Sequence, residues 1–168
     1  MCGIVGYLGN RQATEVLVEG LSKLEYRGYD SAGVAINIGE ELSVRKFKGR
    51  LQVLADDLNA NPINGGLGIG HTRWATHGEP SDVNSHPHFN KEKTIAVVHN
   101  GIIENYLELR EELQKEGYVF LSQTDTEVVA HLVDKFYEGN LLEAVYKATG
   151  KLRGAYALGV VCKDNNNE

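Results

Sequence analysis

The sequence has few cysteines and lacks the segments that mark membrane and secreted proteins. Cys2 and Cys162 are the two cysteines among 168 residues, too few for a disulfide framework and typical of a reducing, cytoplasmic compartment. No apolar run approaches the roughly 20 residues that a membrane-spanning helix needs. The N-terminus has neither the basic region nor the long apolar stretch of a signal peptide. We therefore expect a cytoplasmic protein without a membrane partner.

The patterns that mark metal, nucleotide and nucleic-acid sites are missing as well. The sequence has no HExxH, CxxC, P-loop or GxGxxG pattern. Five of the six histidines fall between residues 71 and 99 without the spacing of zinc ligands, so we expect them to order loops through hydrogen bonds. The formal net charge of −6 is the opposite of the basic surface that nucleic acids require. We expect no metal, no cofactor and no nucleic-acid partner.

What the sequence contains is the composition and patterning of one globular domain. Hydrophobic residues make up 42% and charged residues 24%, and the chain is long enough to bury a core. Apolar periodicity predicts strands at 2–9, 66–72, 94–99 and 154–162, a hairpin of 33–38 and 42–47, and helices at 13–25, 50–59, 104–116, 124–137 and 141–152. Because hairpin strands pair antiparallel, the interleaved strands and helices indicate stacked sheets flanked by helices.

Cys2, directly after Met1, combines two groups that nucleophilic catalysis uses. If Met1 is removed, Cys2 carries a thiol and a free α-amine on one residue. An α-amine has a pKa of roughly 7.7–8.0, against about 10.4 for a lysine side chain, so it can accept a proton near neutral pH. Terminal amines activate nucleophiles in this way. The alternative is that Cys2 is a small buried residue of an N-terminal strand, as Cys162 is expected to be a core residue in its own apolar run.

Two further groups of residues have open alternatives. Arg73 follows a predicted strand, where an arginine can clamp a carboxylate with two hydrogen bonds. Asp125 lies in Thr124–Glu127, which fits the capping-box pattern, so it either caps the predicted helix or pairs with the ammonium group of an amino acid held by Arg73. Asn100 and Gly101 follow a buried strand, and they either form a turn or offer side-chain and backbone donors to an oxyanion.

Six motifs occur in the order found in one enzyme family. They are Cys-Gly-Ile-Val-Gly at 2–6, Leu-Glu-Tyr-Arg-Gly-Tyr-Asp-Ser-Ala-Gly at 24–33, His-Thr-Arg-Trp-Ala-Thr-His-Gly at 71–78, Asn-Ser-His-Pro-His at 84–88, His-Asn-Gly-Ile-Ile-Glu-Asn at 99–105 and Thr-Asp-Thr-Glu-Val at 124–128. Through these motifs, essentially the whole chain resembles the N-terminal glutaminase domain of the glutamine–fructose-6-phosphate aminotransferases, which are class II glutamine amidotransferases.

The resemblance implies an α+β fold, the four-layer αββα sandwich of mainly antiparallel sheets that N-terminal nucleophile hydrolases have. It implies that residues 1–168 form one glutaminase domain that is incomplete at its C-terminus, with the sugar-isomerase domains absent from this chain. It also implies that Cys2 is the nucleophile, with its own amine as the base, and that Asn100 and Gly101 form the oxyanion hole. The implied glutamine-binding residues are Arg73 for the carboxylate, Asp125 for the ammonium group, and Trp74, Thr76, His77 and Gly78 along the pocket, with Arg27 supporting Cys2.

The implied activity is hydrolysis of L-glutamine to glutamate and ammonia through a γ-glutamyl thioester on Cys2. In the full-length enzyme, which is expected to be a homodimer, the ammonia passes to fructose 6-phosphate on the isomerase domain. Two alternatives stay open. One is the glutaminase domain of another class II amidotransferase, such as amidophosphoribosyltransferase, which as a family lacks the run from Trp74 to His77. The other is a catalytically silent binding fragment, because a retained Met1 blocks the amine.

Overall fold

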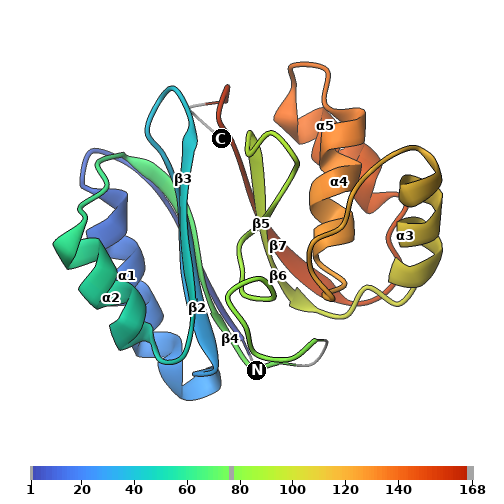
Figure 1. The fold of residues 1–168 in the computed structure, drawn as a ribbon. Helices are drawn as coiled ribbons and strands as arrows, with labels where there is room; N and C mark the ends of the chain where they lie inside the picture. The colour runs from blue at the N-terminus through green and yellow to red at the C-terminus, as the bar shows by residue number, and fades with distance from the viewer. Residues whose placement is uncertain (1, 76–77, 166–168) are drawn as a thin grey trace.

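The computed structural model describes residues 2–75 and 78–165, which form two sheets with helices on their outer faces (Figure 1). The elements, in chain order, are β1 (Gly3–Leu8), α1 (Ala13–Leu24), the 3-10 helix η1 (Glu25–Arg27), β2 (Ser31–Asn37), β3 (Leu42–Lys48), α2 (Leu51–Ala60), β4 (Leu67–Arg73), β5 (His88–Phe89), β6 (Ile95–Gly101), α3 (Tyr106–Lys115), α4 (Glu127–Phe136), α5 (Leu141–Thr149) and β7 (Tyr156–Cys162). Every predicted helix and strand is found within a few residues of these bounds, and η1 and β5 are additional. No helix in this part of the chain is long and apolar enough to cross a membrane.

All strand pairs of the two sheets are antiparallel in the described residues. The first sheet has the order β1-β4-β2-β3 and the second the order β5-β6-β7. The predicted hairpin is confirmed, because β2 pairs with β3 and Val34 lies opposite Arg45. In the first sheet, β4 lies between β1 and β2, so strands that are distant in the sequence become neighbours. Because β1 and β4 run antiparallel, with Gly3 opposite Thr72, the start of β1 lies beside the end of β4.

Apolar side chains fill three interfaces between four layers. Leu17 of α1 and Leu54 of α2 pack on the outer face of the first sheet. The helices α3, α4 and α5 pack on the outer face of the second sheet, with Val129 of α4 fully buried there. Between the sheets lies a third cluster, which consists of Ala35, Leu42, Leu67, Ile69, Ala96, Val98 and Val161. The predicted α+β sandwich with αββα layers is confirmed (Figure 1).

Alternation along β4 separates a side that faces α1 from a side that faces the second sheet. Gly68 and Gly70 face α1, where a Cβ atom would lie 3.1 Å and 3.0 Å, respectively, from leucine side chains of that helix. Ile69 faces the second sheet and belongs to the cluster between the sheets. With a period of two, His71 and Arg73 continue the side that Ile69 occupies. The glycines therefore allow α1 to lie close, and the other side of β4 runs from apolar to polar residues.

The strands β6 and β1 have the same division. In β6, Ala96 and Val98 belong to the cluster between the sheets, and Asn100 is the next residue on that side. In β1, Ile4 packs against this cluster, so Cys2, two residues earlier, is expected on the same side. The space between the sheets is therefore apolar along most of its length, and its polar end carries Cys2, His71, Arg73 and Asn100.

The start of α4 differs from the predicted capping box. The helix begins at Glu127 rather than in the preceding turn, and its N-cap residue Thr126 makes no side-chain cap. The Glu127 carboxylate accepts hydrogen bonds from the backbone N–H groups of Leu121 (2.8 Å) and Ser122 (2.7 Å), which precede the motif. The helix itself is confirmed, but the capping box is wrong, because Glu127 holds the preceding loop instead of its own helix end.

Gly33 and Gly6 provide a matched test of the close packing at β2. A Cβ atom at Gly33 would lie 2.1 Å from the carbonyl oxygen of His86 and 2.6 Å from Lys46 Cβ, whereas at Gly6 it would have no neighbour within 4 Å. We expect Gly33→Ala to lower the free energy of unfolding by about 2–3 kcal/mol, because backbone has to move. Gly6→Ala should change it by about 0.5 kcal/mol or less. Urea denaturation followed by circular dichroism measures both, and equal stability of the two variants would contradict the packing at β2.

Candidate active site

A cavity of about 520 Å³ opens at the polar end of the space between the sheets. The predicted site residues that line it are Cys2, Arg27, Arg73, Trp74, Asn100, Gly101 and Asp125. They come from the N-terminus, η1, the end of β4, the end of β6 and the loop before α4, so the fold joins segments that are far apart in the sequence. Gly78 contacts the site through Arg73. Thr76 and His77 lie outside the described residues.

The pairing of β1 with β4 positions Cys2. This residue directly precedes β1, and the backbone N–H of Trp74, just after β4, donates to Cys2 Sγ at 3.2 Å. Trp74 is 49% exposed, and its ring meets that of Tyr29 edge-on, with 5.6 Å between the ring centroids. Cys2 is a half-buried free thiol, whereas Cys162 is buried in the core as predicted. The end of β4 therefore holds the sulfur of Cys2 next to the guanidinium-bearing Arg73.

Asn100 and Gly101 are the last two residues of β6. The Asn100 Nδ2 group donates to the carbonyl oxygen of Cys2 at 3.1 Å, so this amide lies beside the cysteine. Gly101 has a φ of +116°, and a Cβ atom there would lie 2.3 Å from the carbonyl oxygen of Ala155. Only glycine fits such a position. The turn interpretation is wrong, and the strand end presents a side-chain donor and a glycine backbone to the cavity.

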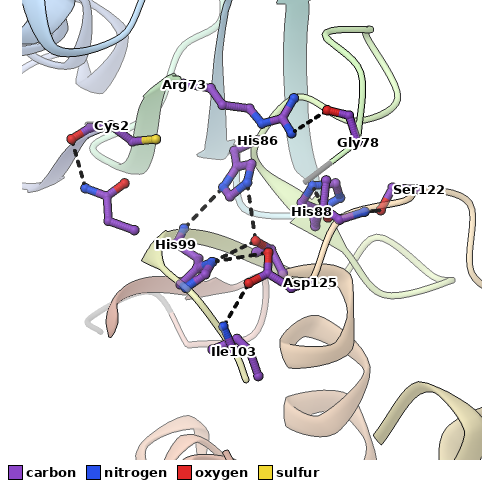
Figure 2. Close-up of polar contacts among 12 residues, drawn as sticks. Cys2, Arg73, Gly78, His86, His88, His99, Ile103, Ser122 and Asp125 are labelled. Atoms are coloured by element: carbon purple, nitrogen blue, oxygen red, sulfur yellow. Dashed lines mark hydrogen bonds and ion pairs between the residues drawn. The ribbon is translucent and has the colours of Figure 1, made fainter. Parts of the chain in front are cut away.

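Arg73 and Asp125 bring opposite charges to the same cavity. Arg73 is 3% exposed, and its Nη2 atom donates to the carbonyl oxygen of Gly78 at 3.2 Å (Figure 2). Asp125 accepts the backbone N–H of Ile103 at 2.8 Å through Oδ2, and its Oδ1 atom lies 3.9 Å from His99 Nδ1. Burial lowers the pKa of Arg73, and nearby acidic groups that include Asp125 oppose that shift. Since Asp125 binds Ile103 and does not cap α4, its interpretation as a helix cap is wrong.

The segment from Arg27 to Asp30 supports the end of β4. Arg27, which was expected to support Cys2, lines the cavity, and a Cβ atom at Gly28 would lie 2.6 Å from the carbonyl carbon of Arg73. The backbone N–H of Asp30 donates to the carbonyl oxygen of Arg73 at 3.2 Å, and its carboxylate accepts the N–H of Ala75. Asp30 and Gly28 belong to a quoted motif, but the sequence assigned them no role. Their function is to fix the backbone that carries the site.

A group of buried histidines lies between the two sheets beside the cavity. The rings of His71 and His86 stack with 4.1 Å between centroids, and His86 meets His88 edge-on at 4.9 Å. Burial lowers the pKa of His71 to about 4 and the pKa values of His86 and His88 well below the usual value, so all three are neutral near pH 7. His86 accepts the backbone N–H of His99 at 3.2 Å, in line with the expected loop-ordering role. Among residues 2–75 and 78–165, no group of three or more His, Cys, Asp and Glu side chains could hold a metal ion.

Known proteins share the sequence of this chain over nearly its whole length. The family model described as glutamine amidotransferase domain matches residues 71–168. Glutamine–fructose-6-phosphate aminotransferase (isomerizing) of Clostridium perfringens (strain 13 / Type A) is 66% identical over 164 residues, which are 98% of this chain and 27% of that protein. The protein of the same name from Clostridium acetobutylicum is 66% identical over 161 residues, 96% of this chain and 26% of that protein. The chain thus spans about a quarter of the length of these curated relatives.

A solved structure shares the fold. Glutamine phosphoribosylpyrophosphate (PRPP) amidotransferase from B. subtilis, complexed with ADP and GMP, matches with a TM-score of 0.84 and 28% sequence identity. The match covers 97% of this chain and 35% of that chain. These similarities confirm the resemblance inferred from the motifs. Because the family model matches more than half of its residues, the chain belongs to the family of glutamine amidotransferase domains.

Proposed function

We propose that the chain is a glutaminase domain, which hydrolyses L-glutamine to glutamate and ammonia through a γ-glutamyl thioester on Cys2. The observation that carries the proposal is that one cavity is lined by the Cys2 thiol, the Asn100 amide and the charges of Arg73 and Asp125. A thiol beside an amide donor suits acyl transfer, and two opposite charges suit the two ends of an α-amino acid. Membership of the glutamine amidotransferase domain family supports glutamine as that amino acid.

Cys2 supplies both the nucleophile and the base in this mechanism. Once Met1 is removed, the neutral α-amine of Cys2 accepts the thiol proton, and Sγ attacks the γ-amide carbon of glutamine. The carbonyl oxygen becomes negative, and the Asn100 Nδ2 group and the Gly101 N–H stabilise it. The C–N bond then breaks, and ammonia leaves with the proton that the amine had taken. Water hydrolyses the remaining thioester to glutamate and restores the thiol.

The charges of the cavity orient the substrate. Arg73 binds the α-carboxylate of glutamine, and Asp125 binds the α-ammonium group. The hydrogen bond from Ile103 holds Asp125 Oδ2 at 2.8 Å, so the carboxylate is fixed before the substrate arrives. The remaining residues proposed along the pocket are Trp74, Thr76, His77 and Gly78, with Arg27 supporting Cys2.

For the whole protein we propose the activity of a glutamine–fructose-6-phosphate aminotransferase, in which the ammonia passes to fructose 6-phosphate. The 66% identity to the Clostridium perfringens aminotransferase supports this activity over that of the amidophosphoribosyltransferases, whose compared structure is 28% identical. In this proposal the chain is the glutaminase part, the isomerase part lies outside residues 1–168, and the full enzyme is a cytoplasmic homodimer. Its partners are small metabolites, without nucleic acid or membrane.

Cys2→Ala is expected to abolish glutamine hydrolysis, because the variant has no sulfur at the cavity. Cys162→Ala is the matched control and should keep activity, since Cys162 is buried in the core. Release of glutamate is the measurement, and intact mass spectrometry of each sample gives the fraction from which Met1 has been removed. Molecules that retain Met1 should be inactive, because their amine is in a peptide bond. Turnover by Cys2→Ala would refute the mechanism, and so would a processed wild type that binds glutamine without turnover.

The pH dependence of kcat tests the α-amine as the base. The amine accepts a proton only in its neutral form, so kcat should rise with pH below the amine pKa and level off above roughly pH 8. Below the plateau, kcat should fall about tenfold for each pH unit. Measurements between pH 6 and pH 9 leave His71 neutral, because burial lowers its pKa to about 4. A flat profile over this range would count against the amine.

Arg73→Gln and Asp125→Asn test the two substrate-binding charges. Asp125→Asn keeps the size of the side chain, Arg73→Gln shortens it, and both remove the charge, so we expect KM for glutamine to rise by about 10–100-fold, or about 1.5–3 kcal/mol. Arg45→Gln is the matched control. Arg45 lies on β3 and forms an ion pair with Asp57 on α2, and neither residue lines the cavity. Steady-state kinetics measure all three. An unchanged KM in Arg73→Gln would contradict the assigned orientation of the substrate.

A further inference from the structure

We propose that His71 is a positioning residue for the oxyanion hole, because it turns the Asn100 side-chain amide so that the NH₂ group faces the reacting centre at Cys2. The proposal rests on the glutaminase function proposed above. His71 is 1% exposed and acts on the reaction only through Asn100. It therefore affects the stabilisation of the negative oxygen and leaves the binding of glutamine to other residues.

Two hydrogen bonds identify His71 Nε2 as a donor. This atom lies 3.0 Å from the carbonyl oxygen of His99 and 2.9 Å from Asn100 Oδ1. A backbone carbonyl only accepts hydrogen bonds, so Nε2 carries a proton. Burial lowers the pKa of His71 to about 4, so at neutral pH the ring has one proton and that proton is on Nε2.

The proton on His71 decides which way round the Asn100 amide lies. With Oδ1 against His71, the Nδ2 group points to Cys2 and donates to its carbonyl oxygen at 3.1 Å. In the reversed orientation, NH₂ would face the N–H of His71, and the amide oxygen would face the carbonyl oxygen of Cys2. Two hydrogen bonds would be lost, at about 0.5–1.5 kcal/mol each. The orientation matters because only the NH₂ group can donate to a negative oxygen.

The neighbouring His86 holds the His71 ring in place. The two rings stack with an interplanar angle of 16°. His86 Nδ1 accepts the N–H of His99 at 3.2 Å, while His71 donates to the carbonyl oxygen of the same residue. In the described residues β5 pairs with β6 only as far as Val97. The backbone N–H and carbonyl groups of His99 bond instead to the side chains of His86 and His71. The backbone of β6 is thereby fixed up to Asn100.

His88 is a matched control for His71. It is also a buried histidine, 3% exposed, but its hydrogen bond goes to Thr124 and not to Asn100. The Ser122 hydroxyl donates to the Glu127 carboxylate at 2.6 Å, and a carboxylate only accepts. The Thr124 hydroxyl must therefore donate to Ser122 Oγ (3.1 Å), and His88 Nε2 must donate to Thr124 (2.9 Å). This chain of hydrogen bonds ends at the start of α4 and does not include Asn100.

The test compares His71→Met with His71→Gln in protein whose free Cys2 N-terminus has been verified by intact mass. The two side chains have similar sizes, but only glutamine can donate from the position of Nε2. We expect His71→Met to lower kcat by about 10–100-fold and to change KM by less than about threefold, because the donor acts mainly in the transition state. His71→Gln should recover most of the loss. His88→Met should keep kcat within about threefold of the wild type.

Alkylation of Cys2 by iodoacetamide is a second readout. The sulfur displaces iodide without forming an oxyanion, so the rate in His71→Met should stay within about threefold of the wild type. If His71→Met does not fold, His71→Asn replaces it, because its donor is too short to reach Asn100, and the same loss is expected. An unchanged kcat, equal losses in the Met and Gln variants, or equal losses in His71→Met and His88→Met would overturn the positioning role. A processed wild type that forms no glutamate would instead overturn the glutaminase proposal.

Discussion

The packing of β4 against β6 across the space between the sheets is the contact on which the candidate site depends. Ile69 of β4 and Val98 of β6 bury their side chains in this space, and the next residues on the same sides are His71 and Asn100. Because side chains alternate with a period of two, a slip of one residue in either strand would turn its polar side chain out of the space between the sheets. The burial that stabilises the sandwich therefore also sets the distance between His71 and Asn100 at the candidate site.

The polar end of this space is stabilised by hydrogen bonds instead of apolar contacts. Burying a charge or an imidazole is unfavourable unless its polar atoms find partners. Asp125 is satisfied by the N–H of Ile103, and His86 by the N–H of His99. These bonds are made between groups of the protein itself, and they orient the donors and charges of the cavity. Such preorganisation is how enzymes stabilise charge that develops in the transition state, and in the proposed mechanism the buried neutral histidines contribute to it.

The sequence was sufficient for the local elements and for the family, but not for the positions of several side chains. Hydrophobic periodicity identified the hairpin and the helices, because these depend on neighbouring residues. The order β1-β4-β2-β3 could not be read from the chain, since it depends on pairing between distant strands. Asn100 was assigned to a turn or an oxyanion hole, and Asp125 to a cap or a ligand site. The contact of Asn100 with Cys2 and that of Asp125 with Ile103 are long-range, and they exclude the turn and the helix cap.

His71 shows that some of this information was present in the sequence. It lies in the strand predicted at 66–72, two residues before Arg73. Because β4 extends to Arg73, the period of two places both residues on one side. What the sequence could not give was the partner of His71, because Asn100 is on the other sheet. Asp30 is similar, since its place in a motif was visible but its hydrogen bonds to Arg73 and Ala75 form only when β2 pairs with β4.

The mass of the Cys2 peptide during turnover tests the central claim most directly. We predict that acid quenching of the processed protein in the steady state with L-glutamine traps a γ-glutamyl group on the N-terminal peptide that begins with Cys2. The peptide that contains Cys162 should remain unmodified. Glutamate formation with no γ-glutamyl group on Cys2, or with that group on another residue, would contradict the proposed role of the cysteine.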